Sequence, residues 1–302
     1  MKLNIGTRGS NLAIAQTNYI MSLIVEKNPN VEFNIDIIKT TGDKILDVPL
    51  GKIGGKGIFV KEIDEALLNG KIDLAVHSMK DIPTDIIKNL EIVSVPTRED
   101  SCDVLISNNN INFDDLPKKS IVGTSSIRRQ AEILFNRNDL CIKNIRGNIE
   151  TRLKKLNDGR FDALIMAHAG LKRLGFENII SQKLSKENFL PAVGQGAIGI
   201  VAQSNSEHRE LFQTINDERS MQRIFAERAL LKHLGGGCQV PIGVCTYINQ
   251  ELYMKAAVFS SNGKRKIETE VYGKPKDYNR IGIKCAKSLI DKGGNDILVK
   301  FL

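Results

Sequence analysis

Short apolar segments with the pattern of β-strands alternate with longer segments of helical pattern through the first two-thirds of the chain. Residues 2–7 begin the series, and residues 33–37 alternate apolar and polar side chains with the period of two that is typical of a strand. Between them, Ser10 is expected to be the N-cap of a helix that ends before Asn28-Pro29. Further strands are expected at 72–76, 104–106, 121–123, 141–145 and 163–166, and further helices after Ser126 and from about Asn148. Strands interleaved with helices in this way indicate parallel α/β sheets with crossover connections.

The last third of the chain has a different pattern. Residues 217–234 are typical of a long amphipathic helix, and strand-like segments follow at 242–248, 252–259 and 266–273 before a last helix near 278–291. Consecutive strands followed by a helix predict a small α+β domain with an antiparallel sheet. A chain of 302 residues is long enough for two or three cores. The sequence therefore predicts two α/β domains and one α+β domain.

A loop rich in glycine is expected from Gly42 to Gly57. It ends in Gly54-Gly55-Lys56-Gly57, which lacks the Ser or Thr that a phosphate-binding P-loop needs after its lysine. A loop over a site, with Lys56 and Phe59 at its edge, is the better interpretation. The segment that follows is expected to be a helix with an apolar face made of Phe59, Ile63, Ala66 and Leu67.

The overall charge narrows the classes of ligand. Lys and Arg outnumber Asp and Glu by 43 to 35, a formal net charge of +8, but the basic residues are scattered. Aromatic residues make up 5% of the chain, too few for a platform on which nucleic-acid bases stack. No apolar run approaches the roughly 20 residues of a membrane span, and Arg8 falls where a signal peptide needs its apolar stretch. We therefore expect a cytoplasmic protein that binds small anions, with no nucleic-acid or membrane partner.

The five cysteines include no Cys-x-x-Cys pair, so neither a disulfide framework nor a zinc site is indicated, and no metal is expected. Three glycines, Gly235 to Gly237, precede Cys238 at the end of the long helix, which is more than a helix C-cap requires. Such a loop suits a close approach to the backbone, and Cys238 is the best candidate for a nucleophile or an attachment site. A buried, inert thiol is the alternative.

Three turns at the ends of predicted strands carry basic residues. In the first, helix-start N–H groups, hydroxyl groups and two guanidinium groups suit a carboxylate or phosphate, although a serine N-cap with two solvated arginines has the same sequence. The second turn places Arg152 one helical turn beyond Asn148, and the third turn contains Arg8, ahead of Ser10. Ligands in open α/β sheets collect at the carboxyl ends of strands, so a ligand with several carboxylates or phosphates is expected. The first two turns are Gly123-Thr124-Ser125-Ser126-Ile127-Arg128-Arg129 and Arg146-Gly147-Asn148 with Arg152.

A fourth turn, from His77 to Pro83, follows the strand expected at 72–76. Pro83 makes the turn rigid, and Asp81 within it can orient donors, hold a cation or pass protons. An Asx-type turn beside a solvated Lys80 is the alternative, and His77 is as well explained as a strand-end histidine without a catalytic part.

Six separated blocks of this sequence resemble the porphobilinogen deaminase family, also called hydroxymethylbilane synthases, and they occur in the family's order over nearly the whole chain. Together they are far more specific than any one of them. The blocks are Thr7-Arg8-Gly9-Ser10 with Leu12-Ala13, Gly54-Gly55-Lys56-Gly57 with Phe59-Val60-Lys61-Glu62, His77-Ser78-Met79-Lys80-Asp81-Ile82-Pro83, Gly123-Thr124-Ser125-Ser126 with Arg128-Arg129, Arg146-Gly147-Asn148 with Thr151-Arg152, and Gly236-Gly237-Cys238.

The resemblance implies a fold of two α/β domains like the lobes of periplasmic anion-binding proteins, joined by hinge strands, and a C-terminal α+β domain with a three-stranded antiparallel sheet. It also implies that the chain crosses back after about residue 191, so that residues 197–203 complete the first domain. The domains expected on this basis are 1–96 with 197–215, 97–196 and 216–302. A monomer is expected.

The family joins four porphobilinogen molecules head to tail, with release of ammonia, into the linear tetrapyrrole hydroxymethylbilane of porphyrin and heme biosynthesis. The resemblance implies the same substrate here and a dipyrromethane cofactor held by a thioether to Cys238. Asp81 matches the catalytic aspartate. The implied cofactor-binding residues are Cys238, Lys80, Asp81, Thr124, Ser125, Ser126, Arg128, Arg129, Arg146 and Gly147. The implied substrate-binding residues are Arg8, Ser10, Gln16, Lys56, Phe59, Arg146, Asn148, Arg152 and Gln195.

The sequence departs from the common family pattern at Thr41, at His168 and along Val201-Ala202-Gln203. None of these positions coincides with the cysteine, the aspartate or the arginines named above. A cytoplasmic two-lobed protein that only binds or senses anions is the alternative function, since it would use the basic turns without Cys238 or Asp81.

Overall fold

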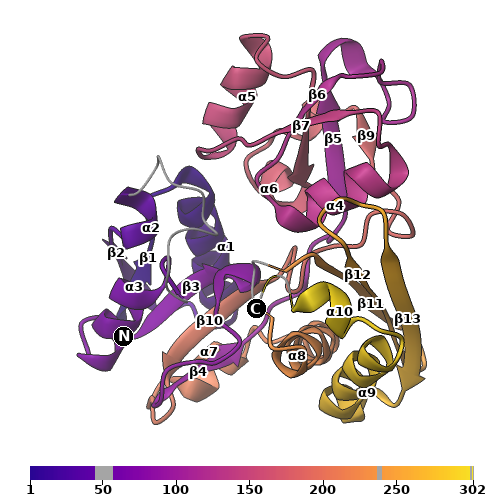
Figure 1. Cartoon of the computed structure of the whole chain (residues 1–302). Coiled ribbons are helices and arrows are strands. Elements are labelled where there is room, and N and C mark those ends of the chain that lie inside the picture. Colours follow the sequence, from indigo (N-terminus) through magenta and orange to yellow (C-terminus); the bar gives the residue numbers. More distant parts are fainter. Residues whose placement is uncertain (45–56, 237–239, 300, 302) are drawn as a thin grey trace. The chain divides into compact units, whose positions relative to one another are not determined.

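The computed structural model describes residues 1–44, 57–236, 240–299 and 301, which form two compact units. The first unit contains Met1–Glu99 and Ala197–Met221, and the second contains Asp100–Gly196 and Gln222–Leu302. The chain therefore passes between the units three times, the last time within helix α8 (Glu218–His233). Figure 1 labels the elements of both units. The division into three domains expected from the resemblance stays a prediction.

The first unit is built around a five-stranded sheet of order β2-β1-β3-β10-β4. Strands β1 and β2 pair in parallel, as do β1 and β3, whereas β10 runs antiparallel to both β3 and β4. The crossing implied by the resemblance is therefore present, because β10 lies between two strands of the first hundred residues. The elements of this unit are β1 (Lys2–Thr7), α1 (Asn11–Lys27), β2 (Glu32–Ile37), α2 (Thr41–Lys44), α3 (Lys61–Leu68), β3 (Leu74–Ser78), the 3-10 turn η2 (Met79–Asp81), β4 (Leu90–Ser94), β10 (Ile198–Gln203) and α7 (Arg209–Gln213).

Local sequence explains where the first helix begins and what it covers. The Ser10 hydroxyl accepts a hydrogen bond from the Ala13 N–H at 3.3 Å and so caps α1, as expected. Ile20 and Ile24 of α1 are buried against Leu3 and Ile5 of β1 in one apolar cluster. This packing fixes α1 on one face of the sheet, with its N-terminus beside the carboxyl end of β1.

The second unit contains a five-stranded sheet of the same pattern, with the order β7-β6-β8-β5-β9. Its helices α4 and α5 begin directly after the turns that follow β6 and β7. The elements are β5 (Asp103–Ser107), η3 (Asn108–Asn110), β6 (Ile121–Gly123), α4 (Ile127–Asn136), β7 (Cys141–Lys143), α5 (Ile149–Asn157), β8 (Ala163–Ala167), α6 (His168–Arg173), η4 (Glu177–Ile179) and β9 (Gln182–Lys183).

Both five-stranded sheets are mixed, which corrects the expectation of parallel sheets: in each, one strand runs antiparallel to its neighbours. Strand β5 runs antiparallel to β8 and β9, as β10 does to its neighbours. In each sheet the antiparallel strand is the first one after the chain has passed from the other unit. This strand follows a passage between the units and not a helical crossover, so the handedness rule for parallel units does not govern it.

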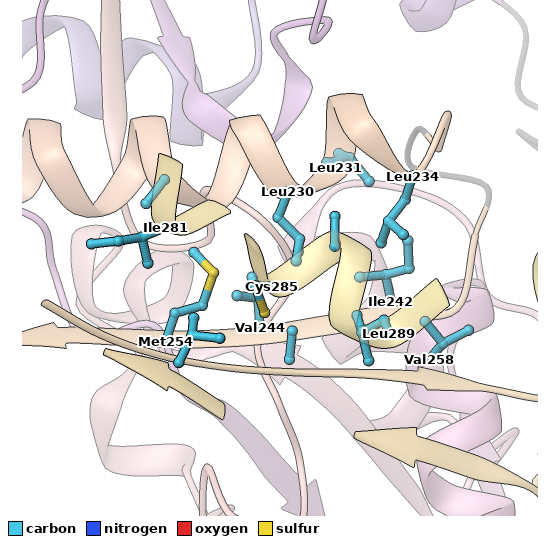
Figure 2. Close-up of a cluster of buried hydrophobic side chains, with 14 of the residues drawn as sticks. Leu230, Leu231, Leu234, Ile242, Val244, Met254, Val258, Ile281, Cys285 and Leu289 are labelled. Atoms are coloured by element: carbon cyan, nitrogen blue, oxygen red, sulfur yellow. The ribbon is translucent and has the colours of Figure 1, made fainter. Parts of the chain in front are cut away.

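The C-terminal part of the second unit matches the prediction closely. Strands β11 (Ile242–Ile248), β12 (Leu252–Phe259) and β13 (Lys266–Gly273) form an antiparallel sheet, followed by η5 (Pro275–Asp277), α9 (Tyr278–Asp291) and α10 (Asn295–Leu298). Figure 2 shows how Leu230 of α8, Leu289 of α9 and Val244 of the sheet contribute to one buried cluster. Gly282 allows α9 to approach α8, because a Cβ there would lie 2.2 Å from the Ala226 carbonyl oxygen. The fold class is therefore the expected one: two α/β sheets and a three-stranded α+β part.

The segment around Phe59 differs from the prediction. Thr41–Lys44 form the short helix α2 where a loop was expected, and α3 begins only at Lys61, so Phe59 lies ahead of it. The Phe59 ring packs against Gly42, where a Cβ would come within 2.2 Å of it. The rest of the expected loop, including Lys56, lies outside the described residues. In the described part of the chain, no helix has the length and apolar composition to span a membrane.

Candidate functional site

The turn after β6 holds its hydroxyl groups in a fixed arrangement. Ser126 is the N-cap of α4 and accepts a hydrogen bond from the Arg129 N–H at 3.4 Å. The Ser126 N–H in turn donates to Thr124 Oγ1 at 3.2 Å. Ser125 Oγ donates to the Ile145 carbonyl at 2.7 Å and so joins this turn to the one after β7. The three predicted residues Thr124, Ser125 and Ser126 thus form one ordered helix start.

Arg128 and Arg129 enter a buried network of charges behind this turn. Asp103, the first residue of β5, has no exposed surface and receives Arg128 Nη1 at 2.8 Å and Arg129 Nη2 at 2.7 Å. Arg128 Nη1 also lies 2.7 Å from Glu132 Oε2, one helical turn further along α4. Gln195 donates from Nε2 to Asp103 Oδ1 at 2.8 Å. The alternative of two solvated arginines is therefore wrong.

The electrostatics of this network follow from burial and proximity. Burial alone would raise the pKa of Asp103, but the Arg128 and Arg129 guanidinium groups lower it well below its usual value. Burial raises the pKa of Glu132 to about 8, although Arg128 acts in the opposite direction. Sequence reasoning missed both acids. The available signal was a carboxylate four residues after Arg128, on the same helix face as that arginine.

The turn after β7 brings a third arginine to the same place. Asn148 caps α5 by accepting from the Thr151 N–H at 2.8 Å, and Arg152 Nε donates to the Gly147 carbonyl at 2.8 Å. The predicted return of Arg152 to the helix start is therefore confirmed. Burial lowers the pKa of Arg152 to about 10, and the charges of Arg129 and Arg146 lower it further in the same direction. The guanidinium groups of Arg129 and Arg146 thus repel that of Arg152, which favours the binding of an anion beside it.

In the first unit, Arg8 follows β1 and is held by a carboxylate. Its Nε lies 3.1 Å from Asp43 Oδ1, Nη2 also contacts that carboxylate, and the guanidinium lies 4.2 Å from the centre of the Phe59 ring. Burial would raise the pKa of Asp43, but hydrogen bonds from Arg8 and Thr40 lower it. No local pattern indicates Asp43 as the partner of Arg8, since the two residues are far apart along the chain.

The turn with Asp81 follows β3 in the same unit. Gln16 is buried and donates from Nε2 to Ser78 Oγ at 2.9 Å, which ties α1 to the end of β3. The buried Met79 donates its N–H to the carbonyl of Ala197, the residue before β10, at 3.0 Å. Lys80 and Asp81 are half-buried on this anchored turn. The backbone position of Asp81 is therefore fixed by its neighbours and not by its own side chain.

His77, at the start of this turn, is buried, and burial lowers its pKa to about 4, with the Arg8 charge acting in the same direction. The folded protein therefore keeps His77 neutral while the unfolded chain protonates it near pH 6.5. We expect the free energy of unfolding to fall as the pH is lowered from about 6.5 to about 4, by an amount of order 3 kcal/mol.

Urea unfolding of the native protein and of His77→Gln at a series of pH values measures this effect. The variant should lose that part of the pH dependence, whereas His208→Gln, at a half-buried histidine of the same unit, should keep it. Identical pH profiles for the native protein and His77→Gln would show that His77 has no such role.

The cysteine prediction falls on residues that the structure does not describe, since Cys238 lies outside the described ranges. Of the four described cysteines, Cys102 and Cys285 are buried, and burial raises the pKa of both thiols to about 12. Cys141 is exposed and Cys245 is half-buried. The two buried thiols are poor nucleophiles as they stand, which leaves the candidacy of Cys238 unchanged.

Comparison with known proteins gives full-length matches. A family model described as "Porphobilinogen deaminase, dipyromethane cofactor binding domain" matches residues 3–210, and one described as "Porphobilinogen deaminase, C-terminal domain" matches residues 221–291. The protein named porphobilinogen deaminase from Bacillus pumilus is 46% identical over 302 residues, which covers 99% of this chain and 96% of that protein. The one from Natranaerobius thermophilus is 45% identical over 305 residues, with 99% and 98% covered.

Among solved structures, a periplasmic binding protein of Salmonella typhimurium with high arginine specificity gives a TM-score of 0.41 at 12% identity, over 73% of this chain and 93% of that one. The sequence matches are much stronger evidence for a family than this structural likeness, because they extend from the first strand to the last long helix at about 45% identity. The chain therefore belongs to the porphobilinogen deaminase family.

Proposed function

We propose that Asp81 is the catalytic carboxylate of this enzyme and that Arg129, Arg146 and Arg152 hold carboxylate groups of its pyrrole chain. The enzyme is a hydroxymethylbilane synthase, a transferase that joins four porphobilinogen molecules head to tail with release of ammonia. Family membership favours this function over that of a two-lobed anion sensor, which would need neither Asp81 nor Cys238.

The observation that carries the proposal is the cluster of three guanidinium groups at the starts of α4 and α5. Porphobilinogen bears an acetate and a propionate group, so a chain of linked pyrroles is a polyanion. Burial lowers the pKa of Arg152, and repulsion by the charges of Arg129 and Arg146 lowers it further, which supports an anion site here. Carboxylate groups bound there would relieve that repulsion and gain charge-assisted hydrogen bonds.

The same chemistry fits the dipyrromethane cofactor of the family. When bound, this group supplies the terminal pyrrole to which the first substrate is joined. The capped helix starts offer hydroxyl and guanidinium donors for its acidic side chains, and Cys238 would form the thioether. The residues proposed to hold it are Lys80, Asp81, Thr124, Ser125, Ser126, Arg128, Arg129, Arg146 and Gly147. Of these, Arg128 and Arg129 are also tied to Asp103, which fixes their direction.

Asp81 is proposed to act on protons and positive charge at the reacting pyrrole. Each addition breaks the bond to the amino group, which leaves as ammonia, and forms a carbon–carbon bond to the next pyrrole. The pyrrole that forms this bond becomes cationic and must lose the proton from its α-carbon. A carboxylate at the pyrrole N–H stabilises that charge and helps the proton to leave. The anchored backbone of η2 sets the position of Asp81 for this role.

The remaining residues are proposed to position the substrate: Arg8, Ser10, Gln16, Lys56, Phe59, Arg146, Asn148, Arg152 and Gln195. Arg8 already has a carboxylate partner within the protein. Its guanidinium is paired with Asp43, so it binds a substrate carboxylate by sharing or exchanging that partner. The proposal includes a monomer that works in the cytoplasm without a nucleic-acid or membrane partner; the scattered basic residues support the lack of a nucleic-acid partner.

The substitution Arg152→Gln tests the arginine cluster. A hydrogen bond to a charged group contributes about 1.5–3 kcal/mol, so the KM for porphobilinogen should rise roughly 10- to 100-fold. Consumption of porphobilinogen, followed by colour with Ehrlich's aldehyde reagent, measures this. Lys154→Gln, at an exposed lysine of the same helix, is the matched control and should leave KM unchanged. Equal KM values for the two variants would contradict the proposed role, and no consumption by the native protein would contradict the function.

A further inference from the structure

Cys102 and His168 lie opposite each other at the end of a strand pair in the second unit. Strands β5 and β8 run antiparallel with Asp103 paired to Ala167, so the residues just beyond that pair are Cys102 and His168. Their backbones continue the ladder, because the His168 N–H donates to the Cys102 carbonyl at 3.1 Å. The sheet register therefore fixes the separation of a thiol and an imidazole that are distant in sequence.

Asp100 folds back onto the same place. Its Oδ1 accepts from the Cys102 N–H at 3.1 Å, and its Oδ2 lies 3.3 Å from Cys102 Sγ. One ligand atom from each of Asp100, Cys102 and His168 can be chosen so that all three atoms lie within 4.8 Å of one another. A carboxylate oxygen, a sulfur and a ring nitrogen thus converge on one small space.

The imidazole of His168 has no hydrogen bond to account for its position. The residue is 2% exposed, and neither ring nitrogen has a hydrogen-bond partner in the described structure. A buried polar group without a partner is costly, and an imidazole left in this way is free to bind a ligand. Glu177 Oε1 lies 3.3 Å from His168 Nε2, a place from which a carboxylate can orient a metal-binding imidazole.

We propose that Asp100, Cys102 and His168 bind one divalent transition-metal ion of the zinc type. On binding, the Cys102 thiol gives its proton to solvent and a metal–sulfur bond forms, with no change of oxidation state. Donors on one tetrahedral zinc ion lie roughly 3.3–3.8 Å apart, so the three groups need to close by little more than about 1 Å. The fourth position is left for water.

The donor set favours zinc over the hard cations. Thiolate and imidazole are preferred by Zn²⁺ and its neighbours in the first transition series, whereas Mg²⁺ and Ca²⁺ take oxygen ligands. The nearby positive charges are Lys186 Nζ, 2.6 Å from Asp100 Oδ1, and Lys183 Nζ, 3.9 Å from Oδ2. Lys186 contacts Oδ1, whereas Oδ2 is the oxygen that faces the Cys102 thiol. The cysteine spacing gave no sign of this site, because sheet pairing and not a short motif brings the ligands together.

The site is separate from the residues proposed for the reaction, although Cys102 directly precedes Asp103 of the arginine network. Metal binding is therefore tested by itself and not through activity. The full-length holoenzyme, stripped of metal with a chelator, is titrated with Zn²⁺ by calorimetry and with Co²⁺ by absorption spectroscopy. We expect one equivalent of either metal per chain and a thiolate-to-cobalt charge-transfer band in the near ultraviolet.

Variants assign the site. Cys102→Ser and His168→Gln should each weaken Zn²⁺ binding at least roughly 100-fold, since loss of even an outer partner costs up to that much. Asp100→Asn, at a partly exposed residue that spares the core, should also weaken it. Cys141→Ser is the matched control at an exposed thiol and should change nothing. The proposal is overturned if native protein shows no charge-transfer band, or if the band and the affinity survive in Cys102→Ser or depend on Cys141.

Discussion

Replacing Asp81 by alanine is expected to slow porphobilinogen turnover by about 10²-fold or more, in the range usual for a group that moves protons in the transition state. The substitution should leave the turn intact, because Met79 and Ile82 are the buried residues of that segment and Asp81 itself is only half-buried. The expected defect is therefore in the rate constant kcat and not in folding. Steady-state consumption of porphobilinogen, with thermal unfolding measured in parallel, tests both parts.

Two control variants distinguish the role of the Asp81 carboxylate from a general effect of removing one negative charge. Asp85→Ala removes an exposed carboxylate four residues away and should keep kcat near the native value. Asp81→Glu keeps the carboxylate but moves it by one methylene, so its rate should fall between those of the native protein and Asp81→Ala. Intact mass confirms that each variant carries the cofactor before rates are compared. A kcat for Asp81→Ala within a few-fold of native would show that Asp81 is not the catalytic carboxylate.

The second large effect concerns stability. Asp103→Asn keeps the shape of the side chain but removes the negative charge that both Arg128 and Arg129 contact in the interior. Breaking a buried ion pair by neutralising one partner costs about 3–5 kcal/mol, because the other charge stays buried. Glu132 compensates in part, since its pKa falls when Asp103 no longer repels its negative charge. We expect Tm to fall by roughly 10 °C, measured by calorimetry.

The matched control is a carboxylate with cationic partners at the surface. Glu268 is exposed and contacts Lys266 of β13 and Lys255 of β12, so Glu268→Gln should change Tm little. A Tm for Asp103→Asn as high as that of Glu268→Gln would mean that the buried network does not stabilise the second unit.

Most of the fold could be predicted from periodicity, because each element obeys a local rule. The bounds predicted for β11, β12, β13 and α9 are those of the structure, and the Ser10 and Asn148 side chains cap their helices by accepting from the backbone N–H three residues further on. The antiparallel entry of β5 and β10 could not be predicted from local pattern, since it depends on which unit the chain has just left. The resemblance to a known family supplied the position of β10.

The residues of the candidate site also fall into those that local sequence pattern could place and those that it could not. Arg152 could be placed from helix geometry, whereas Asp43, Asp103 and Glu132 gained their roles only from contacts made in three dimensions. The hydrophobic pattern predicts a strand at 104–106 but not that Asp103 begins it or that two arginines neutralise that residue. The pairing of Cys102 with His168 depends on strand register, which no spacing of residues in this sequence reveals.

The most direct test of the account is the intact mass of freshly purified protein, because the proposed reaction requires a pyrrole primer bonded to Cys238. We predict that the native protein is heavier than its polypeptide by one dipyrromethane group and that Cys238→Ser, still folded, has the mass of its polypeptide. An active native preparation with no added mass, or the same added mass on Cys238→Ser, would contradict the account.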